Sequence, residues 1–513
     1  MSTAAARSRS ANSAASRGKA SVLAHKHLRG VDWLAREPNY EYFIRPMTRQ
    51  HGAPMTRYRE IYDRLRTSIA DGKLRAGDRI PPARALAAEL HLARGTVDTA
   101  YSLLAGEGFL VAKGRAGTFI SPSMPELLGK PQQGSGNGGP AEWDPEDFRP
   151  LFDAPLPLMP GLPSFDLFPR KLWSQSVARQ VRQSGVTHMT YPDPLGFPAL
   201  RQALASYVTV ARGIRCAPDQ IIITGGYLGA LGLICRAMLA PGARVWIETP
   251  GYGFTRRAIQ MVGAVPVPIS VDEEGLDVAE GLEVAPDAAL CVVAPSNQFP
   301  LGVNLSLRRR AALLNWARVS GSWIVEDDYT GEFRYEGGPL PALKSLDAQD
   351  RVFYIGTFSK TMFPGLRIGY LIVPTAMLVH FRDHVRRLEG GRATLEQAAL
   401  AEFIAKGHFG RHIKKMRSLY KVRMTALAAA MENVFEGRFD MRPITGGLHL
   451  VAHTKDDEND ADLEAAAAAA GLGPLALSKM DLGRRYGGGL LLGFANLPED
   501  QALAVVRRLK GAL

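Results

Sequence analysis

The feature that most constrains this chain is a stretch at 121–160 that is rich in Pro, Gly and Ser. It contains the run KPQQGSGNGGP, a composition that favours a linker over a packed element. Because such a stretch interrupts any continuous hydrophobic core, the 513 residues are expected to form more than one domain. We therefore predict a flexible linker at 122–162 with a separate domain on each side.

Positive charge is concentrated before this linker. Residues 1–120 carry 20 Lys and Arg against 10 Asp and Glu, whereas the rest of the chain contributes only +2 to the net charge of +12. A basic first quarter on a nearly neutral remainder indicates a module that binds a polyanion, although a solvated basic tail has the same composition. Residues 1–50 are expected to be a disordered basic extension.

The sequence points to neither a membrane nor a secreted protein. It has no apolar run of about 18 residues without charge, and the basic N-terminus is not followed by the apolar segment of a secretory signal. Cys216, Cys235 and Cys291 lie far apart, which speaks against a disulfide framework and a zinc site. We expect a protein of the reducing cytoplasm without a metal.

The chain before the linker follows the pattern of three short helices and a hairpin. Apolar residues recur at helical spacing, and Pro82 is placed to open the second helix. The predicted helices lie at 58–69, 83–90 and 94–106, and the predicted strands at 108–111 and 117–120. This pattern predicts a winged helix-turn-helix domain, which we place at 51–121.

In a helix-turn-helix the second helix of the pair enters the major groove of DNA, and its first residues meet the base edges. That helix begins at Arg94, whose fork suits guanine because it pairs with two acceptors at once. The hairpin tip is placed to reach phosphate or the minor groove. The predicted DNA-binding residues are Arg84, Arg94, Thr96, Lys113 and Arg115. The alternative is a small helical domain for protein contact, with these side chains as surface charge.

The stretch 62–120 resembles the GntR-type winged helix. The runs GKLRAGDRIPPARALAAEL, ARGTVDTAYSLLAGEGFL and GRAGTF carry the resemblance across three helices and the wing in order. Two residues depart from it. Ala93 takes the place of a capping Ser or Thr, and Asp98 lies where several relatives carry a base-contacting arginine. The operator sequence therefore does not transfer from those relatives.

Beyond the linker, strands and helices alternate from about Phe165 onward, which predicts an α/β domain with a largely parallel sheet. Five motifs follow along this domain, and each alone has an ordinary explanation. Asp327 and Asp328 also fit a metal site or a solvated turn, and Lys360 fits a surface lysine. The motifs are QIIITGGYL at 220–228, PGY at 250–252, PSNQFPLG at 295–302, IVEDDY at 324–329, and GTFSK at 356–360 with PGLRIGY at 364–370.

Together the motifs supply the groups that pyridoxal 5′-phosphate (PLP) needs. Lys360 provides the amine for a Schiff base, and Asp327 after an apolar strand can keep the pyridine nitrogen protonated. Tyr329, with Asn297, suits the phenolic oxygen of the ring, and Tyr252 can stack on its face. The residues expected to hold the phosphate are Thr357, Ser359, Arg367 and the amides of Gly226, Tyr227 and Leu228.

With these motifs the chain from about Arg57 to Leu513 resembles the MocR/GabR family, a GntR-type winged helix fused to a fold-type I aminotransferase-like domain. The runs EDDYTGEFRY, GTFSKTMFPGLRIGY, YPDPLGFPALRQALASYVTVARGIRC and SNQFPLGV carry this resemblance. It implies a PLP-binding effector and dimerisation domain at 163–513, with Lys360 as the internal aldimine lysine, Asp327 as the pyridine partner and Arg367 as a phosphate ligand.

The same resemblance implies how the protein works. It implies a head-to-tail, domain-swapped homodimer that binds double-stranded operator DNA and is regulated by PLP, with or without a small amino-compound effector. Such a regulator belongs to the bacterial cytoplasm and is associated with the nucleoid when it is bound to DNA.

Several residues of the large domain depart from the family at places that bear on the effector. Tyr227-Leu228 replaces a common Ser-Gln, Asn297 stands where His is usual, and Leu301 where Thr is usual. Phe254 lies where one branch of the family has an effector-binding arginine. The late strand LLLGFA at 490–495 lacks the arginine with which aminotransferases of this fold bind a substrate carboxylate. Candidates for a replacement, each also explained as surface charge, are Arg442, Arg484 and Arg485.

These observations favour a PLP-dependent transcriptional regulator that senses PLP, an amino compound or both through Lys360. The cofactor set also fits an active aminotransferase that carries a DNA-binding domain, and the missing strand arginine counts against that function. A third possibility is a protein that has lost PLP and keeps the fold as a dimerisation scaffold. The intact set of Lys360, Asp327, Tyr329 and Arg367 speaks against it.

Overall fold

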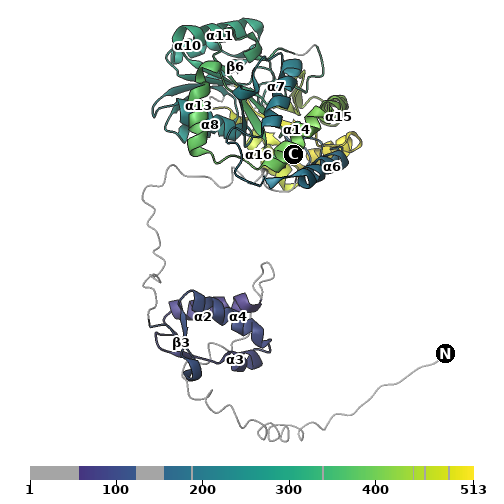
Figure 1. Cartoon of the computed structure of the whole chain (residues 1–513). Helices are drawn as coiled ribbons and strands as arrows, with labels where there is room; N and C mark the ends of the chain where they lie inside the picture. Colours follow the sequence, from purple (N-terminus) through teal and green to yellow (C-terminus); the bar gives the residue numbers. More distant parts are fainter. Residues whose placement is uncertain are drawn as a thin grey trace, which may run out of the picture. The chain divides into compact units, whose positions relative to one another are not determined.

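The computed structural model describes residues 57–122, 155–186, 189–337, 340–442, 444–455, 458–482 and 486–513. The chain divides into two units, 1–143 and 144–513. Figure 1 shows each unit with its own set of helices and strands, and each has its own hydrophobic core. The predicted basic extension at 1–50 and residues 123–154 of the predicted linker lie outside the described residues.

The first unit contains the three helices and the hairpin that the sequence predicts. Strands β2 and β3 form the hairpin, and β1 adds a third antiparallel strand beside β3. The sequence did not indicate β1, because two residues are too few to show an alternating pattern. The elements are α2 (Arg57–Ala70), β1 (Arg79–Ile80), α3 (Ala83–Glu89), α4 (Arg94–Gly106), β2 (Leu110–Ala112) and β3 (Thr118–Ile120).

The core of the first unit lies beneath α3 and α4. Leu86, Val97 and Leu104 are buried there, as their helical spacing predicts. Tyr101 is buried as well, and its hydroxyl donates a hydrogen bond to the Pro81 carbonyl at 2.8 Å, which satisfies its polar end. Leu90 packs against this core and is only partly buried. The buried face of α4 thereby leaves its first turn, with Arg94, exposed.

The second unit is built on an eight-stranded sheet in the order β4-β11-β10-β9-β8-β5-β6-β7. The central strands β10, β9, β8, β5 and β6 are parallel, whereas β11, β4 and β7 pair antiparallel. The predicted, largely parallel sheet is therefore confirmed. The strands are β4 (Ile221–Thr224), β5 (Arg244–Thr249), β6 (Val265–Asp272), β7 (Gly275–Leu276), β8 (Leu290–Val293), β9 (Trp323–Asp328), β10 (Val352–Thr357) and β11 (Gly369–Ile372).

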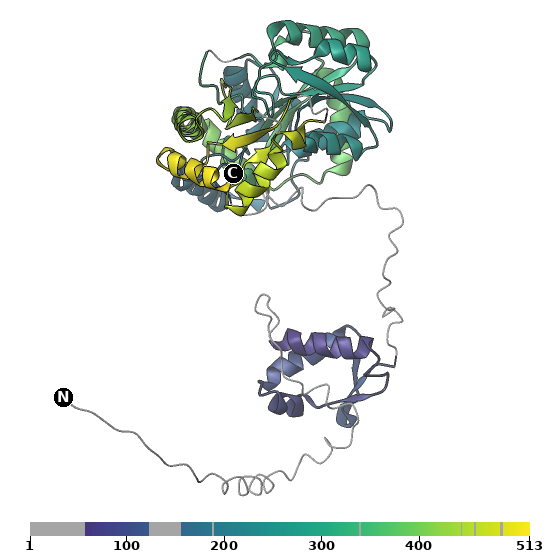
Figure 2. The same cartoon turned by 180° about the vertical axis from the view of Figure 1, so that it is seen from behind.

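Helices cover both faces of this sheet, because its strands are apolar on both sides. Along β5, Val245 and Ile247 pack into the core with α8, α9 and α13, while Trp246 points to the opposite face. There Trp246 stacks on Trp316 of α11 at 4.0 Å between ring centroids. Figures 1 and 2 show these layers from opposite sides. The helices are α7 (Pro198–Arg212), α8 (Tyr227–Met238), α9 (Gly253–Gln260), α10 (Val278–Val284), α11 (Leu307–Ser320), α12 (Leu343–Leu346), α13 (Leu378–Leu388) and α14 (Thr394–Ala405).

A smaller antiparallel sheet, in the order β12-β13-β15-β14, completes the second unit. The alanine run at 465–470 lies mostly in α16. The elements are α6 (Arg170–Gln183), α15 (His408–Phe435), β12 (Phe439–Met441), β13 (His449–Thr454), α16 (Asp460–Ala469), β14 (Leu475–Ala476), β15 (Gly489–Gly493) and α17 (Ala502–Ala512).

The structure places residues 155–162 in the second unit rather than in the linker. Leu158 is buried, and its carbonyl accepts a hydrogen bond from the amide of Gly493 on β15 at 2.7 Å. The Pro157 carbonyl accepts another from Gly473 at 2.9 Å. This run, PLPLMPGL, is rich in Pro and Gly, so its composition resembles that of the linker although its backbone pairs with β15. The packed domain thus begins before residue 163.

A buried ion pair joins α7 to the end of β9 and allows a test of this fold. Nε of Arg212 lies 2.6 Å from Oδ2 of Asp328, and Tyr354 donates to the same oxygen at 2.7 Å. We expect Arg212→Met to lower the free energy of unfolding by about 3–5 kcal/mol, because it leaves a buried carboxylate without its cation. Urea unfolding followed by tryptophan fluorescence measures the loss. The double variant Arg212→Met/Asp328→Asn should recover part of it, and a single variant as stable as the wild type would contradict the assignment.

Candidate functional site

Three consecutive acidic residues end strand β9 near the middle of the large sheet, and their surroundings differ. Glu326 accepts hydrogen bonds from the amides of Leu343 and Lys344, both at 2.8 Å. Asp328 has the arginine and tyrosine partners described above. Oδ1 of Asp327 is buried and has no hydrogen-bond partner among the described residues. The carboxylate of Asp327 is therefore available to a ligand.

Lys360, just beyond the end of β10, faces the same place. Burial raises the pKa of Asp327, Asp328 raises it further, and Lys360 opposes the rise. Burial lowers the pKa of Lys360 to about 8, and Asp327 opposes that change. Nζ of Lys360 donates a hydrogen bond to the Gly161 carbonyl at 2.7 Å. The site thus combines an unsatisfied acid with an amine that is partly neutral near physiological pH.

Aromatic and amide side chains surround this pair. Nδ2 of Asn297 donates to the Tyr329 hydroxyl at 2.9 Å. The rings of Tyr227 and Tyr252 lie 6.0 Å apart between centroids, and the Tyr227 hydroxyl lies 2.7 Å from Oγ1 of Thr255. A cavity of about 50 Å³ is lined by Tyr227, Tyr252 and Asp327, among others. The predicted stacking tyrosine and the predicted acid therefore border the same space.

The predicted phosphate-binding residues meet around the start of α8. This helix begins at Tyr227, and the amides of a first helical turn lack partners within the helix. Arg367 reaches this turn, because its Nη2 donates to the Gly225 carbonyl at 2.9 Å. Gly226, at a φ of 82°, adopts a backbone conformation that favours glycine. The side chain of Leu228 is exposed, so only its amide is suited to this site.

The remaining predicted ligands come from the loop between β10 and β11. Oγ1 of Thr357 donates to Oγ of Ser359 at 3.1 Å and accepts from the Ser359 amide at 3.2 Å. Strand β11 carries this loop back against the turn at Gly226, since a Cβ on Gly369 would lie 2.8 Å from the Gly226 Cα. The structure thus brings this loop next to the start of α8, as a shared phosphate site requires.

Several residues near the site were not indicated by the sequence motifs. Gly161 lies in the run assigned to the linker, and its carbonyl contacts Lys360. Glu248 is next to the PGY motif; burial raises its pKa to about 8, and it accepts a hydrogen bond from the Ala294 amide at 3.2 Å. A Cβ on Gly225 would lie 2.9 Å from Nη1 of Arg392, so a second guanidinium lies against the turn. Gly161 and Arg392 lie far from the motifs in the sequence, so the motifs could not predict these contacts.

The structure also shows what occupies the strand that lacks an arginine. Leu491 of β15 is buried in an apolar cluster with Val451 and Leu477, against which Phe299 and Leu301 pack. Arg442, one candidate replacement, has an exposed side chain 3.6 Å from Asp440. The other two candidates, Arg484 and Arg485, lie outside the described residues. Along β15, apolar side chains therefore stand where a carboxylate-binding arginine would be needed.

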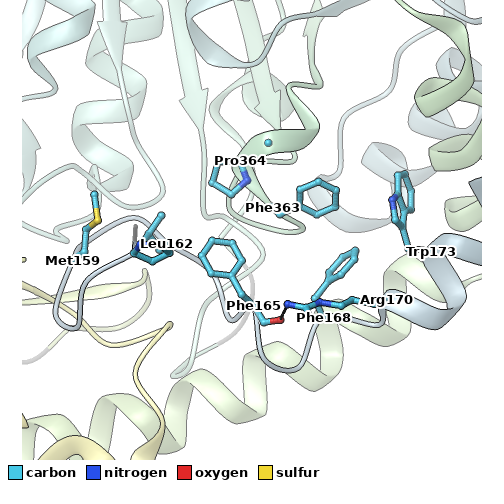
Figure 3. Close-up of a pocket in the computed structure, with 10 residues that line it drawn as sticks. Met159, Leu162, Phe165, Phe168, Arg170, Trp173, Phe363 and Pro364 are labelled. Carbon is cyan, nitrogen blue, oxygen red and sulfur yellow. Dashed lines mark hydrogen bonds between the residues drawn. The ribbon is translucent and has the colours of Figure 1, made fainter. Parts of the chain in front are cut away.

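A larger, open groove of about 480 Å³ lies beside the start of the second unit (Figure 3). Apart from Arg170, the side chains that line it are apolar, with aromatic rings from both the 155–173 stretch and the loop after Lys360. Nη2 of Arg170 donates to the Phe165 carbonyl at 3.3 Å, a contact visible in Figure 3. The lining offers no acid or amine for chemistry. Asp327, with Tyr227 and Tyr252, lines the smaller cavity instead.

The predicted DNA-binding residues lie on the surface of the first unit. Arg84, Arg94, Lys113 and Arg115 are exposed, and Thr96 is half-buried. Nζ of Lys113 lies 5.1 Å from the centroid of the Phe119 ring, and Gly114–Ala116 forms a short 3₁₀ turn at the hairpin tip. Nε of Arg94 contacts the Asp98 carboxylate at 3.2 Å. The four cationic side chains that are predicted to contact DNA are therefore accessible to it.

Comparisons with known proteins agree with both units. Residues 57–120 match the model of the bacterial regulatory proteins of the gntR family, and residues 166–470 match that of aminotransferase class I and II. The chain is 32% identical over 474 residues to the probable rhizopine catabolism regulatory protein MocR of Rhizobium meliloti, covering 91% of this chain and 95% of that protein. It is 33% identical over 458 residues to the pyridoxine biosynthesis regulator PdxR of Corynebacterium glutamicum, covering 88% and 95%.

Solved aminotransferases share the fold of the second unit. A kynurenine aminotransferase of Pyrococcus horikoshii aligns with a TM-score of 0.66 and 26% identity, over 72% of this chain and 95% of that one. The α-aminoadipate aminotransferase LysN of Thermus thermophilus aligns with a TM-score of 0.64 and 25% identity, over 70% and 92%.

The two units together define a DNA-binding transcriptional regulator that carries a fold-type I aminotransferase-like domain. The chain belongs to the MocR family of these regulators. Within the described residues, no helix is long and apolar enough to cross a membrane, and no group of three His, Cys, Asp or Glu side chains is placed to hold a metal ion.

The lowered pKa of Lys360 predicts an unusual reactivity with aldehydes. An amine attacks an aldehyde only when it is neutral, and a pKa of about 8 makes half of this amine neutral at pH 8, against an ordinary value of 10.5. The rate of reaction with PLP, followed by visible absorbance, should rise from pH 7 to pH 9 and level off above. A rate that keeps rising tenfold per pH unit through pH 10 would show that Lys360 titrates as an exposed lysine does.

Proposed function

We propose that this regulator binds PLP at Lys360 and converts the occupancy of that site into a change in operator binding. The observation that carries the proposal is the pairing of Lys360, whose pKa is lowered, with Asp327, whose buried oxygen has no partner among the described residues. The aminotransferase LysN was solved in complex with N-(5′-phosphopyridoxyl)-L-leucine. A phosphopyridoxyl group in so similar a fold supports the same class of cofactor here.

Each predicted residue has a role that fits its surroundings. PLP supplies an aldehyde and a ring that withdraws electrons when its nitrogen is protonated. Asp327 would hold the proton on that nitrogen, and Tyr329, oriented by Asn297, would donate to the phenolic oxygen. Tyr252 would cover one face of the ring. The phosphate would be held by Thr357, Ser359, Arg367 and the amides of Gly226, Tyr227 and Leu228.

We further propose that the protein works as a domain-swapped homodimer in the bacterial cytoplasm, as its family resemblance implies. Two DNA-binding units in one dimer would match a two-part operator. Large apolar side chains on the surface of the second unit support a partner there: Tyr191 is 98% exposed and Met189 is 78% exposed. An amino-compound effector that competes for the cofactor's aldehyde would then act through the same site.

An active aminotransferase is the second candidate, and the intact lysine and acid of the site favour it. The apolar cluster around Leu491 argues against it, because a substrate carboxylate would lie there without a cation. Sustained turnover of an amino donor and a keto acid would decide for the enzyme. Conversion limited to the bound cofactor would decide for the regulator.

The cofactor assignment predicts a spectroscopic result. PLP linked to a lysine amine absorbs in the visible, and Lys360→Ala should abolish the band that the wild-type protein shows after incubation with PLP. Lys479→Ala is a matched control, because Lys479 lines the cavity that Asp327 borders but is exposed and paired with Glu464 at 2.8 Å. The control should keep the band. A band that persists in Lys360→Ala would place the cofactor on another lysine.

The DNA assignment predicts a loss of specific affinity. Arg94→Ala should weaken binding to a selected operator by about 1–3 kcal/mol at fixed salt, because it removes a contact to a base edge. Fluorescence anisotropy with labelled duplex measures the change. Arg318→Ala, which removes an exposed arginine from α11 in the second unit, should leave the affinity unchanged. Equal operator affinity for Arg94→Ala and the wild type would contradict the assignment of α4.

A further inference from the structure

The first turn of α4 breaks several rules of helix stability at once. Its N-cap is Ala93, which makes no side-chain hydrogen bond, and the turn contains no acidic residue. Arg94 occupies the first helical position, where a positive charge opposes the helix dipole. Gly95 follows, although glycine is unfavourable in a helix. A Cβ at this position would meet nothing within 4 Å, so close packing does not require a glycine here. Such a departure from local stability is expected where a surface serves binding.

One hydrogen bond holds the Arg94 side chain, and it uses a particular edge of the guanidinium. Nε of Arg94 donates to Oδ2 of Asp98, one helical turn later, at 3.2 Å. The two side chains remain 69% and 48% exposed. This is the one hydrogen bond of the Arg94 side chain within the described part of the chain, so its terminal nitrogens Nη1 and Nη2 have no partner there. The contact orients the guanidinium of Arg94 through Nε and leaves Nη1 and Nη2 available to a ligand.

We infer that Asp98 is a specificity-determining residue that orients Arg94 to read one guanine in the major groove. Guanine presents two acceptors there, O6 and N7, and a fork held through Nε can meet both with Nη1 and Nη2. Adenine presents one acceptor and one donor at the corresponding positions, so the same fork rejects it. An oriented fork also loses less conformational entropy on binding than a free one.

The charge of Asp98 shows that its role is selectivity rather than affinity. A carboxylate near the phosphates weakens binding to every sequence by repulsion. As a stabilising pair for the helix it contributes little, because exposed pairs of this kind add a few tenths of a kcal/mol and the order Arg before Asp is the weaker one. The remaining contribution of Asp98 is the orientation that it gives to the Arg94 side chain. Asp98 thus acts through Arg94 as a positioning residue.

The test compares base preference with overall affinity in the full-length protein. This inference rests on the proposed regulator function, so the operator is first selected from randomised duplexes at one salt concentration. Affinity is then measured for the selected site and for sites in which each guanine is replaced in turn. The wild type should prefer guanine by about tenfold at the position read by Arg94, and Arg94→Ala should abolish that preference.

Asp98→Ala should reduce this guanine preference by roughly threefold, as expected for an exposed ion pair, while binding to non-specific DNA stays equal or becomes tighter. Asp98→Asn keeps an acceptor for Nε, so its preference should lie between those of the wild type and Asp98→Ala. In the double variant Arg94→Ala/Asp98→Ala the preference should be no lower than in Arg94→Ala alone.

Asp63→Ala is the matched control. Asp63 faces Arg59 on α2 at 3.8 Å with the same spacing and similar exposure, 58% and 44% for the arginine and the acid. Asp63→Ala should change neither the guanine preference nor the ratio of operator affinity to affinity for non-specific DNA. An unchanged guanine preference in Asp98→Ala would overturn the inference, and so would a loss of preference at a different base pair. Sequence-independent binding by the wild type would instead contradict the regulator function itself.

Discussion

The second unit depends on the cost of burying three carboxylates at the end of one parallel strand. Charge in a protein interior is tolerated only when it is paired or hydrogen-bonded. Backbone amides at the start of α12 serve Glu326, and the Arg212 guanidinium serves Asp328. These two contacts hold α7 and α12 against β9. Asp327, between them, receives no such partner and faces Lys360. Glu326 and Asp328 thus each have hydrogen-bond partners, whereas the acid between them is left for a ligand.

The same principle appears in the first unit on a smaller scale. The buried face of α4, with Val97 and Leu104, anchors the helix in its core. Its first turn lacks a cap and carries an unfavourably placed Arg94 held only by Asp98. In both units a well-packed element carries, at one end, a side chain that lacks its most stabilising partners: Asp327 on β9 and Arg94 on α4. Those ends are the places where a cofactor and a DNA base would complete the missing interactions.

The sequence predicted the elements that have a strong period and the residues that lie in compact motifs. The three helices of the first unit agree with their predicted bounds to within two residues, and Lys360 lies near Asp327 because adjacent parallel strands β9 and β10 end at the same edge. Contacts between distant segments were not predictable. Gly161 and Arg392 reach the site through loop geometry, and the strand-like pairing of Leu158 with Gly493 was hidden by a composition rich in proline. The residues assigned to the phosphate and to DNA, and the homodimer, stay predictions.

In the proposed mechanism, occupancy at Lys360 changes how the winged helix binds DNA. The direct measurement is the affinity for a selected operator at fixed salt, with and without saturating PLP, for the wild type and Lys360→Ala. We expect a change of about fivefold or more in the wild type, within the usual range of coupling between two sites. We expect no change in Lys360→Ala. Equal wild-type affinities in the presence and absence of PLP would contradict this mechanism.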